Sequence, residues 1–201
     1  AKVGDKIAVL DRLIELSDAL LIGGGMANTF FKAEGYAVGD SLVEDEKLDE
    51  ARRLMVKAAA AGKRFVLPVD VAIGEKFAAD ATRMLTSPDA VPEGWRILDV
   101  GPQTLIAFGE VLADAQTIIW NGTLGVAEFP AFARGTNALI HLLDERTAEG
   151  AVTIVGGGDS AAAVEAAGAA EALTHVSTGG GASMEFLEGR ELPGVAALRD
   201  A

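Results

Sequence analysis

Residues 152–165, VTIVGGGDSAAAVE, join a short apolar run to three glycines, an aspartate, a serine and an alanine-rich helical pattern. The stretch predicts a strand, a tight turn and a helix, because glycine permits close approach of the backbone and the first amides of a helix have no acceptor within it. Such a turn favours an anionic ligand. Asp159 would repel a phosphate unless a cation lay between them, so we interpret it as a Mg²⁺ ligand beside a nucleotide phosphate. Capping of the helix by Asp159 is the alternative.

The composition restricts the class of protein. A chain of 201 residues, of which 50% are hydrophobic, is expected to form one globular domain, residues 1–201. Its net charge of -13, from 17 basic and 30 acidic residues, argues against nucleic acid and anionic membranes as partners. The absence of cysteine excludes disulfides and thiolate chemistry and fits a cytoplasmic protein. No apolar run approaches the roughly 20 residues of a membrane span.

Strand-like runs alternate with helical patterns along the chain. Apolar residues recur at helical spacing in residues 3–14, and Ser41 with Glu44 has the spacing of a capping box before a helix that ends at Gly62. Short apolar runs predict strands at residues 19–22, 64–69, 96–100, 117–120, 152–155 and 175–177. Residues 74–95 have no regular pattern and are expected to be irregular. The alternation predicts an α/β fold, a doubly wound Rossmann-like sheet of about six parallel strands with helices on both faces.

Glycine-rich turns follow five of these six predicted strands. They read GGG at 23–25, GP at 101–102, NG at 121–122, GGG at 156–158 and GGG at 179–181. Parallel sheets bind ligands at the carboxyl ends of their strands, so we expect the turns to share one edge of the sheet. The need for tight turns alone explains one or two of them well and all five poorly.

The chain lacks the motifs of several other chemistries. No glycine-lysine pair is followed by Ser or Thr, which excludes a Walker-type phosphate loop, and no G-x-S-x-G indicates a serine hydrolase. Gly156, Gly158 and Ala161 fit a dinucleotide pattern, but Ser177 and Thr178 occupy the place where an acid should hold the ribose. Phosphoryl transfer by positioning and charge neutralisation fits better. A nucleotide-binding module without chemistry of its own is the remaining alternative.

Six segments resemble the carboxy-terminal, nucleotide-binding half of phosphoglycerate kinase. They are AKVGDK (1–6), GGGMANTF (23–30), DVGPQT (99–104), WNGTLGVAE (120–128), GGGDSAAAVE (156–165) and HVSTGGGASMEFLEG (175–189). They follow one another in the family's order and extend over essentially the whole chain. The resemblance implies a glycolytic kinase that moves a phosphoryl group between 1,3-bisphosphoglycerate and ADP, giving 3-phosphoglycerate and ATP, with Mg²⁺.

The resemblance also implies roles for individual residues. Lys2 is expected to contact the nearer phosphates and Lys6 the transferred phosphoryl group, although spacing alone favours a solvated helix face. Asp159 is expected to hold Mg²⁺ and Glu128 the ribose. The glycines expected to present amides to the transferred group are Gly179, Gly180 and Gly181. The other expected nucleotide-binding residues are Gly23, Gly24, Leu42, Gly101, Asn121, Val126, Gly156, Gly157, Gly158 and Ser160.

The sequence departs from the family pattern in a few places. Thr123 replaces a proline and Ala127 an aromatic residue, which predicts a looser loop beside the adenine, whereas Ser160 keeps the hydroxyl of the family's threonine. The family's amino-terminal domain, which binds 3-phosphoglycerate, is not in this sequence. We therefore expect a monomeric fragment, cut near the interdomain hinge, that binds ADP or ATP without turnover and meets 3-phosphoglycerate or 1,3-bisphosphoglycerate only through that other domain.

Overall fold

A computed structural model describes residues 4–177 and, beyond them, residues 179, 182, 185–186, 189–192 and 196–197, without the side chains of residues 5, 7 and 8. The α-helices are α1 (Ile7–Leu16), α2 (Gly24–Ala33), α3 (Leu48–Ala60), α4 (Pro102–Leu112), α5 (Arg134–Ala148) and α6 (Gly158–Ala166). The strands are β1 (Ala19–Leu21), β2 (Arg64–Val66), β3 (Val71–Gly74), β4 (Arg83–Thr86), β5 (Arg96–Val100), β6 (Thr117–Asn121), β7 (Val152–Gly156) and β8 (His175–Ser177). The longest of these helices, α5, has 15 residues, and no described helix combines the length and apolar character that a bilayer span requires.

The described strands form three separate sheets. β1 pairs with β2 in parallel, and β6, β7 and β8 form a parallel sheet in that order. β5 instead pairs antiparallel with β3, whose other edge carries β4. The prediction of about six parallel strands is therefore not confirmed, because residues 96–100 belong to the antiparallel sheet. The reason is that residues 71–86, most of which were expected to be irregular, form a hairpin that offers β5 a hydrogen-bonding edge.

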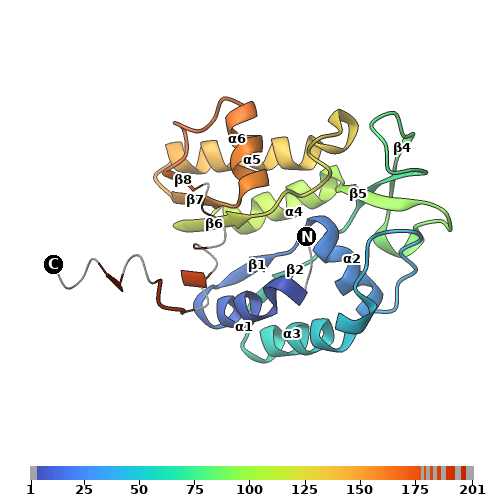
Figure 1. The fold of residues 1–201 in the computed structure, drawn as a ribbon, viewed down its shortest axis with the longest axis horizontal. Coiled ribbons are helices and arrows are strands. Elements are labelled where there is room, and N and C mark those ends of the chain that lie inside the picture. The colour runs from blue at the N-terminus through green and yellow to red at the C-terminus, as the bar shows by residue number, and fades with distance from the viewer. Residues whose placement is uncertain are drawn as a thin grey trace.

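The parallel pair β1–β2 has an apolar core on each face, which confirms the α/β class. Leu20 and Phe65 face one hydrophobic core, which contains residues of α1, α2 and α3. Leu21 and Val66, one position further along each strand, pack against a second core formed with α4, α5 and α6. Successive side chains of a strand point to opposite faces, so this alternation places helices on both sides of the strands. Figure 1 shows α1 and α3 below β1 and β2, with α5 and α6 at the opposite side of the molecule.

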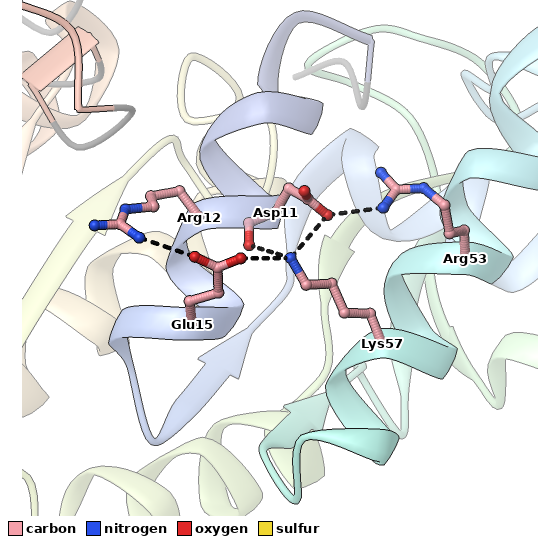
Figure 2. A network of polar contacts seen from close by, with 5 residues as sticks. All are labelled: Asp11, Arg12, Glu15, Arg53 and Lys57. Carbon is pink, nitrogen blue, oxygen red and sulfur yellow. Dashed lines mark hydrogen bonds and ion pairs between the residues drawn. The ribbon is translucent and has the colours of Figure 1, made fainter.

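Polar contacts join α1 to α3 at the surface (Figure 2). Arg53 Nη1 lies 2.8 Å from Asp11 Oδ1, and Lys57 Nζ lies 2.9 Å from Glu15 Oε1. The hydrogen bond from Arg53 lowers the pKa of the Asp11 carboxyl, and the one from Lys57 lowers the pKa of Glu15. Such exposed pairs contribute little to stability. Their effect is to orient α1, whose N-terminal residue follows Lys6.

The helix expected after Ser41 begins later than the sequence indicated. A 3₁₀ turn spans Asp45–Lys47, and α3 starts at Leu48 with no side-chain cap. Ser41 Oγ donates to the carbonyl of Val38, and a Glu44 carboxylate oxygen accepts the amide of Gly4 at 3.1 Å. The predicted capping box is therefore wrong, because both of its side chains have other partners.

Candidate functional site

Two glycine-rich turns are tied together where β6 and β7 end. The parallel register places Asn121 opposite Gly156. Asn121 Nδ2 donates to the Gly156 carbonyl at 2.8 Å, and the Gly122 amide donates to Ser160 Oγ at 2.8 Å. Ser160 is fully buried, so its hydroxyl is held inside the fold. The two turns thus form one rigid edge.

Lys6 reaches this edge from the start of α1. Its Nζ donates to Asn121 Oδ1, so that Asn121 contacts both the lysine and the backbone of the turn after β7. A Cβ on Gly122 would lie only 3.7 Å from Lys6 Nζ, which shows how closely the ammonium approaches the turn after β6. The arrangement places a positive charge beside two glycine-rich turns.

The turn after β7 opens α6 without a side-chain cap. The N-cap is Gly157, whose φ of 102° lies in the left-handed region that favours glycine. The amides of the first helical turn have no acceptor in the helix, and the helix dipole makes this end attractive to anions. Asp159 lies exposed in that first turn and makes no capping hydrogen bond. The alternative that Asp159 serves as a helix cap is therefore not supported.

The number of carboxylates near this edge determines how a metal ion could be bound. Within the described part of the chain, no three His, Cys, Asp or Glu side chains gather closely enough to bind a metal on their own. Mg²⁺ commonly takes one or two carboxylates and completes its octahedral shell with phosphate oxygens and water. A lone exposed Asp159 at an anion-attracting helix start fits that mode of binding.

The turn after β1 packs against the loop that follows β6. Gly24 has a φ of 60°, and a Cβ on it would lie 2.6 Å from the carbonyl oxygen of Thr123. A Cβ on Gly23 would lie 2.5 Å from a methyl carbon of Leu124. Leu124 is buried, and its amide donates to Thr136 Oγ1 of α5 at 3.1 Å. Glycine is thus required at position 24, where a Cβ would meet backbone, whereas a Cβ at position 23 would have to displace the Leu124 side chain.

The rest of this loop carries Val126 and Glu128. The Val126 amide donates to the carbonyl of Leu98 at 2.9 Å, and Glu128 is exposed. Phe129 packs against Phe77 with ring centroids 5.0 Å apart, and Phe77 is 60% exposed. An exposed aromatic ring is thus placed next to this loop. The sequence analysis did not select Phe77, because it lies in a region without periodicity.

The other predicted site residues lie on other elements or outside the described residues. Leu42 is 57% exposed, and its carbonyl accepts Asn28 Nδ2 at 3.2 Å. Gly101 is buried where a Cβ would collide with the carboxylate of Asp70. Gly179 is exposed, and its amide donates to Ser177 Oγ at 3.2 Å. The positions outside the described residues are Lys2, Gly180 and Gly181.

Two acids that the sequence analysis did not select cap neighbouring helices. Asp99, 1% exposed, accepts the amides of Val100 and of Gly135, in the first turn of α5, both at 2.9 Å. Asp70 accepts the Thr104 amide in the first turn of α4 at 2.8 Å. Burial raises the pKa of Asp99 to about 6, although these amides and the charge of a nearby arginine oppose the shift. The signal in the sequence was an acid among the otherwise apolar residues 97–100 of β5.

Known proteins resemble the chain over its whole length. The family model described as phosphoglycerate kinase matches residues 1–190. A phosphoglycerate kinase of Chloroflexus aggregans is 56% identical to this chain over 201 residues. A protein of Nicotiana tabacum named "Phosphoglycerate kinase, cytosolic" is 54% identical over 201 residues. Each comparison covers 100% of this chain and 50% of the relative. The structure of phosphoglycerate kinase from Coxiella burnetii has a TM-score of 0.93 at 43% identity and covers 99% of this chain and 50% of its own. The chain therefore spans about half the length of the curated relatives it matches.

Proposed function

Because this chain belongs to the phosphoglycerate kinase family, we propose that it is the nucleotide-binding half of a phosphoglycerate kinase. In this proposal it binds ADP or ATP with Mg²⁺ and, together with a second half, transfers a phosphoryl group between 1,3-bisphosphoglycerate and ADP. The reaction class is phosphoryl transfer to a carboxyl group. The observation that carries the proposal is the meeting of Lys6, Asn121 and the uncapped start of α6 at one edge.

The phosphates of the nucleotide are assigned to the start of α6. The free amides after Gly157 and the positive end of the helix dipole attract the phosphate oxygens. Asp159 repels a phosphate on its own, so its carboxylate is assigned to a phosphate-bound Mg²⁺. When bound, this ion would reduce the negative charge of the phosphates and orient them. Ser160 would act indirectly, since its buried hydroxyl holds the amide of Gly122 in place.

The base and ribose are assigned to the two loops that pack together beside β1. Gly23 and Gly24 let the turn after β1 lie directly against Thr123 and Leu124. The half-buried Val126 and the exposed ring of Phe77 supply apolar area on this side of the molecule. Glu128 is exposed on the same loop as Val126, where its carboxylate can accept ribose hydroxyls. Leu42 and Gly101 are retained in this assignment on the family resemblance alone.

The transfer step needs charge neutralisation more than covalent chemistry. The transferred phosphoryl group spreads negative charge over its oxygens, and the ammonium of Lys6 is assigned to that charge. Lys2 is assigned to the nearer phosphates of the nucleotide. The amides of residues 179–181 are assigned to the transferred phosphoryl group. We also propose a cytoplasmic monomer without nucleic-acid or membrane partners, in keeping with the net charge of -13 and the relative named as cytosolic.

Calorimetric titration of the 201-residue chain tests the binding part of the proposal. ADP is expected to bind, more tightly with Mg²⁺ than without it, and NAD is expected not to bind. Binding of NAD without binding of ADP would overturn the proposal in favour of a dinucleotide enzyme.

A second experiment tests turnover. Formation of 1,3-bisphosphoglycerate from ATP and 3-phosphoglycerate is measured with this chain alone and with the other half of a relative added. Alignment of donor and acceptor can lower a barrier by roughly 7 to 11 kcal/mol, so the chain alone is expected to be nearly inactive. Turnover by the chain alone at the rate of an intact enzyme would contradict this, because the acceptor site would then lie within these 201 residues.

A further inference from the structure

A cavity of about 190 Å³ lies between β4, the end of β5 and the first turns of α4 and α5. Its apolar walls come from Leu85, Val100, Pro102 and Leu105, and two arginines, Arg83 and Arg134, also line it. The cavity shares no lining residue with the proposed nucleotide site, so what it could bind is a separate question.

Neither arginine of this cavity has an ionic partner among the described residues. Five other described arginines form ion pairs with carboxylates, namely Arg12, Arg52, Arg53, Arg96 and Arg146, whereas Arg64 is exposed and forms none with a described residue. Arg83 Nε is buried without a hydrogen-bond partner, as are the Nε atoms of Arg96 and Arg146, but those two arginines also form ion pairs. Buried polar atoms normally have a partner, and this chain carries 30 acidic residues against 17 basic ones. Arg83 is half-buried and Arg134 is exposed to water. Because the two arginines line one cavity and form no ion pair among the described residues, the cavity is a candidate site for an anion.

The surroundings of Arg83 disfavour its charge. Burial, and after it the like charge of Arg134, lower the pKa of Arg83, while the charges of Asp99 and Asp70 oppose this. Neither of these acids lines the cavity, and each carboxylate already accepts backbone amides, from α5 and α4 respectively. A guanidinium nevertheless stays protonated at neutral pH, so the repulsion between the two arginines persists until an anion lies between them.

We propose that this cavity binds a small, doubly charged oxyanion of the phosphate class, either the free ion or a short phosphomonoester. Two guanidinium groups match the charge of a dianion, whereas a carboxylate would neutralise only one of them. Guanidinium also binds phosphate oxygens through paired hydrogen bonds. The buried side chain of Val100 and the half-buried side chain of Leu105 offer contact area to the carbon atoms of an ester.

The test is a titration of the ¹⁵N-labelled 201-residue chain with sodium sulfate at constant ionic strength, followed by NMR. Sulfate is a dianion that does not titrate near neutral pH. Saturable shifts are expected for the amides of Gly135 and Leu105. Arg83→Gln and Arg134→Gln are each expected to raise the sulfate dissociation constant roughly tenfold, as the loss of a charged hydrogen bond should. Arg83→Lys, which keeps the charge, is expected to recover part of the affinity.

Control variants separate this cavity from other anion sites. Arg12→Gln removes an exposed arginine of α1 that pairs with Glu15, and Lys6→Ala removes the cation of the proposed phosphate site. Both are expected to leave the sulfate shifts at Gly135 unchanged. A second titration, with methyl phosphate, identifies the natural form: tighter binding than sulfate supports an ester, and equal or weaker binding supports the free ion.

Three results would overturn the proposal. The first is a set of shifts that grows without saturation, and the second is saturable binding that survives in the Arg83→Gln/Arg134→Gln double variant. The third is a set of shifts confined to Gly122 and Gly157 and lost in Lys6→Ala, since the anion would then bind at the proposed nucleotide phosphate site. Amide shifts of the double variant that match the wild type away from the cavity establish that its fold is kept.

Discussion

Replacement of Asp99 by asparagine is expected to change how stability depends on pH. The carboxyl is 1% exposed, and burial raises its pKa from the ordinary 3.8 to about 6. A group whose pKa is higher in the folded state binds more protons there than in the unfolded state. The free energy of unfolding therefore decreases as the pH rises from about 4 to about 6, and the loss is complete above that range.

The pKa values set the size of this effect. The ordinary and folded values, 3.8 and about 6, differ by about two pH units. At about 1.4 kcal/mol per unit, the decrease amounts to roughly 3 kcal/mol. Asparagine keeps the shape but cannot ionise, so the variant should lack this decrease. It also turns an NH₂ group toward Val100 or Gly135, which costs about 1 to 3 kcal/mol at every pH and does not alter the slope.

Urea unfolding of the wild type and Asp99→Asn at several pH values from 4 to 8 measures this difference. Other carboxylates act with the opposite sign. Asp11, whose pKa is lowered mainly by Arg53, contributes stability that is lost in acid. Subtracting the two curves cancels such contributions, and Asp114→Asn, which removes an exposed carboxylate, controls for net charge. Parallel curves for the wild type and Asp99→Asn would refute the reasoning.

Three further substitutions test the proposed site. Asp159→Asn should weaken ADP binding in calorimetry only when Mg²⁺ is present, and an equal loss without the ion would contradict its assignment to the metal. Lys6→Ala should lower turnover, measured with the other half added, more than it lowers ADP affinity; equal effects would count against a role in the transition state. Gly24→Ala should lower the free energy of unfolding in urea by about 2 kcal/mol more than Gly35→Ala. Both glycines have positive φ, but a Cβ would meet a backbone oxygen only at Gly24, so equal losses would show that the loops separate freely.

Local pattern was sufficient to predict most of the elements. The run from Val152 into the following glycines forms β7 and the start of α6, as predicted, and the GGG at 23–25 follows β1 and opens α2. Hydrophobic periodicity and glycine turns are properties of a few adjacent residues, so they can be recognised without knowledge of the fold. The six family segments identified the phosphoglycerate kinase family correctly, since motif order is also a property of the sequence.

The strand with which each strand pairs could not be predicted from such local patterns. The run RILDV at residues 96–100 suits a parallel or an antiparallel sheet equally well, and only its pairing with β3 decides the outcome. The hairpin of β3 and β4 was missed because Gly74, Pro88 and Pro92 obscured a periodicity that spans only four residues per strand. Pairing depends on which edge is available in space, which short-range pattern does not encode.

The sequence by itself therefore determined the α/β class, the glycine-rich turns and the family, because each follows from residues that are close together in the chain. Only the tertiary structure decided that Lys6 contacts Asn121, that Asp99 caps α5 across the fold, and that Arg83 shares a cavity with Arg134. These residues lie 36 to 115 positions apart or on unrelated elements, where periodicity gives no information. Their contacts, and the energies that follow from burial and charge, exist only once the two cores have packed against the strands.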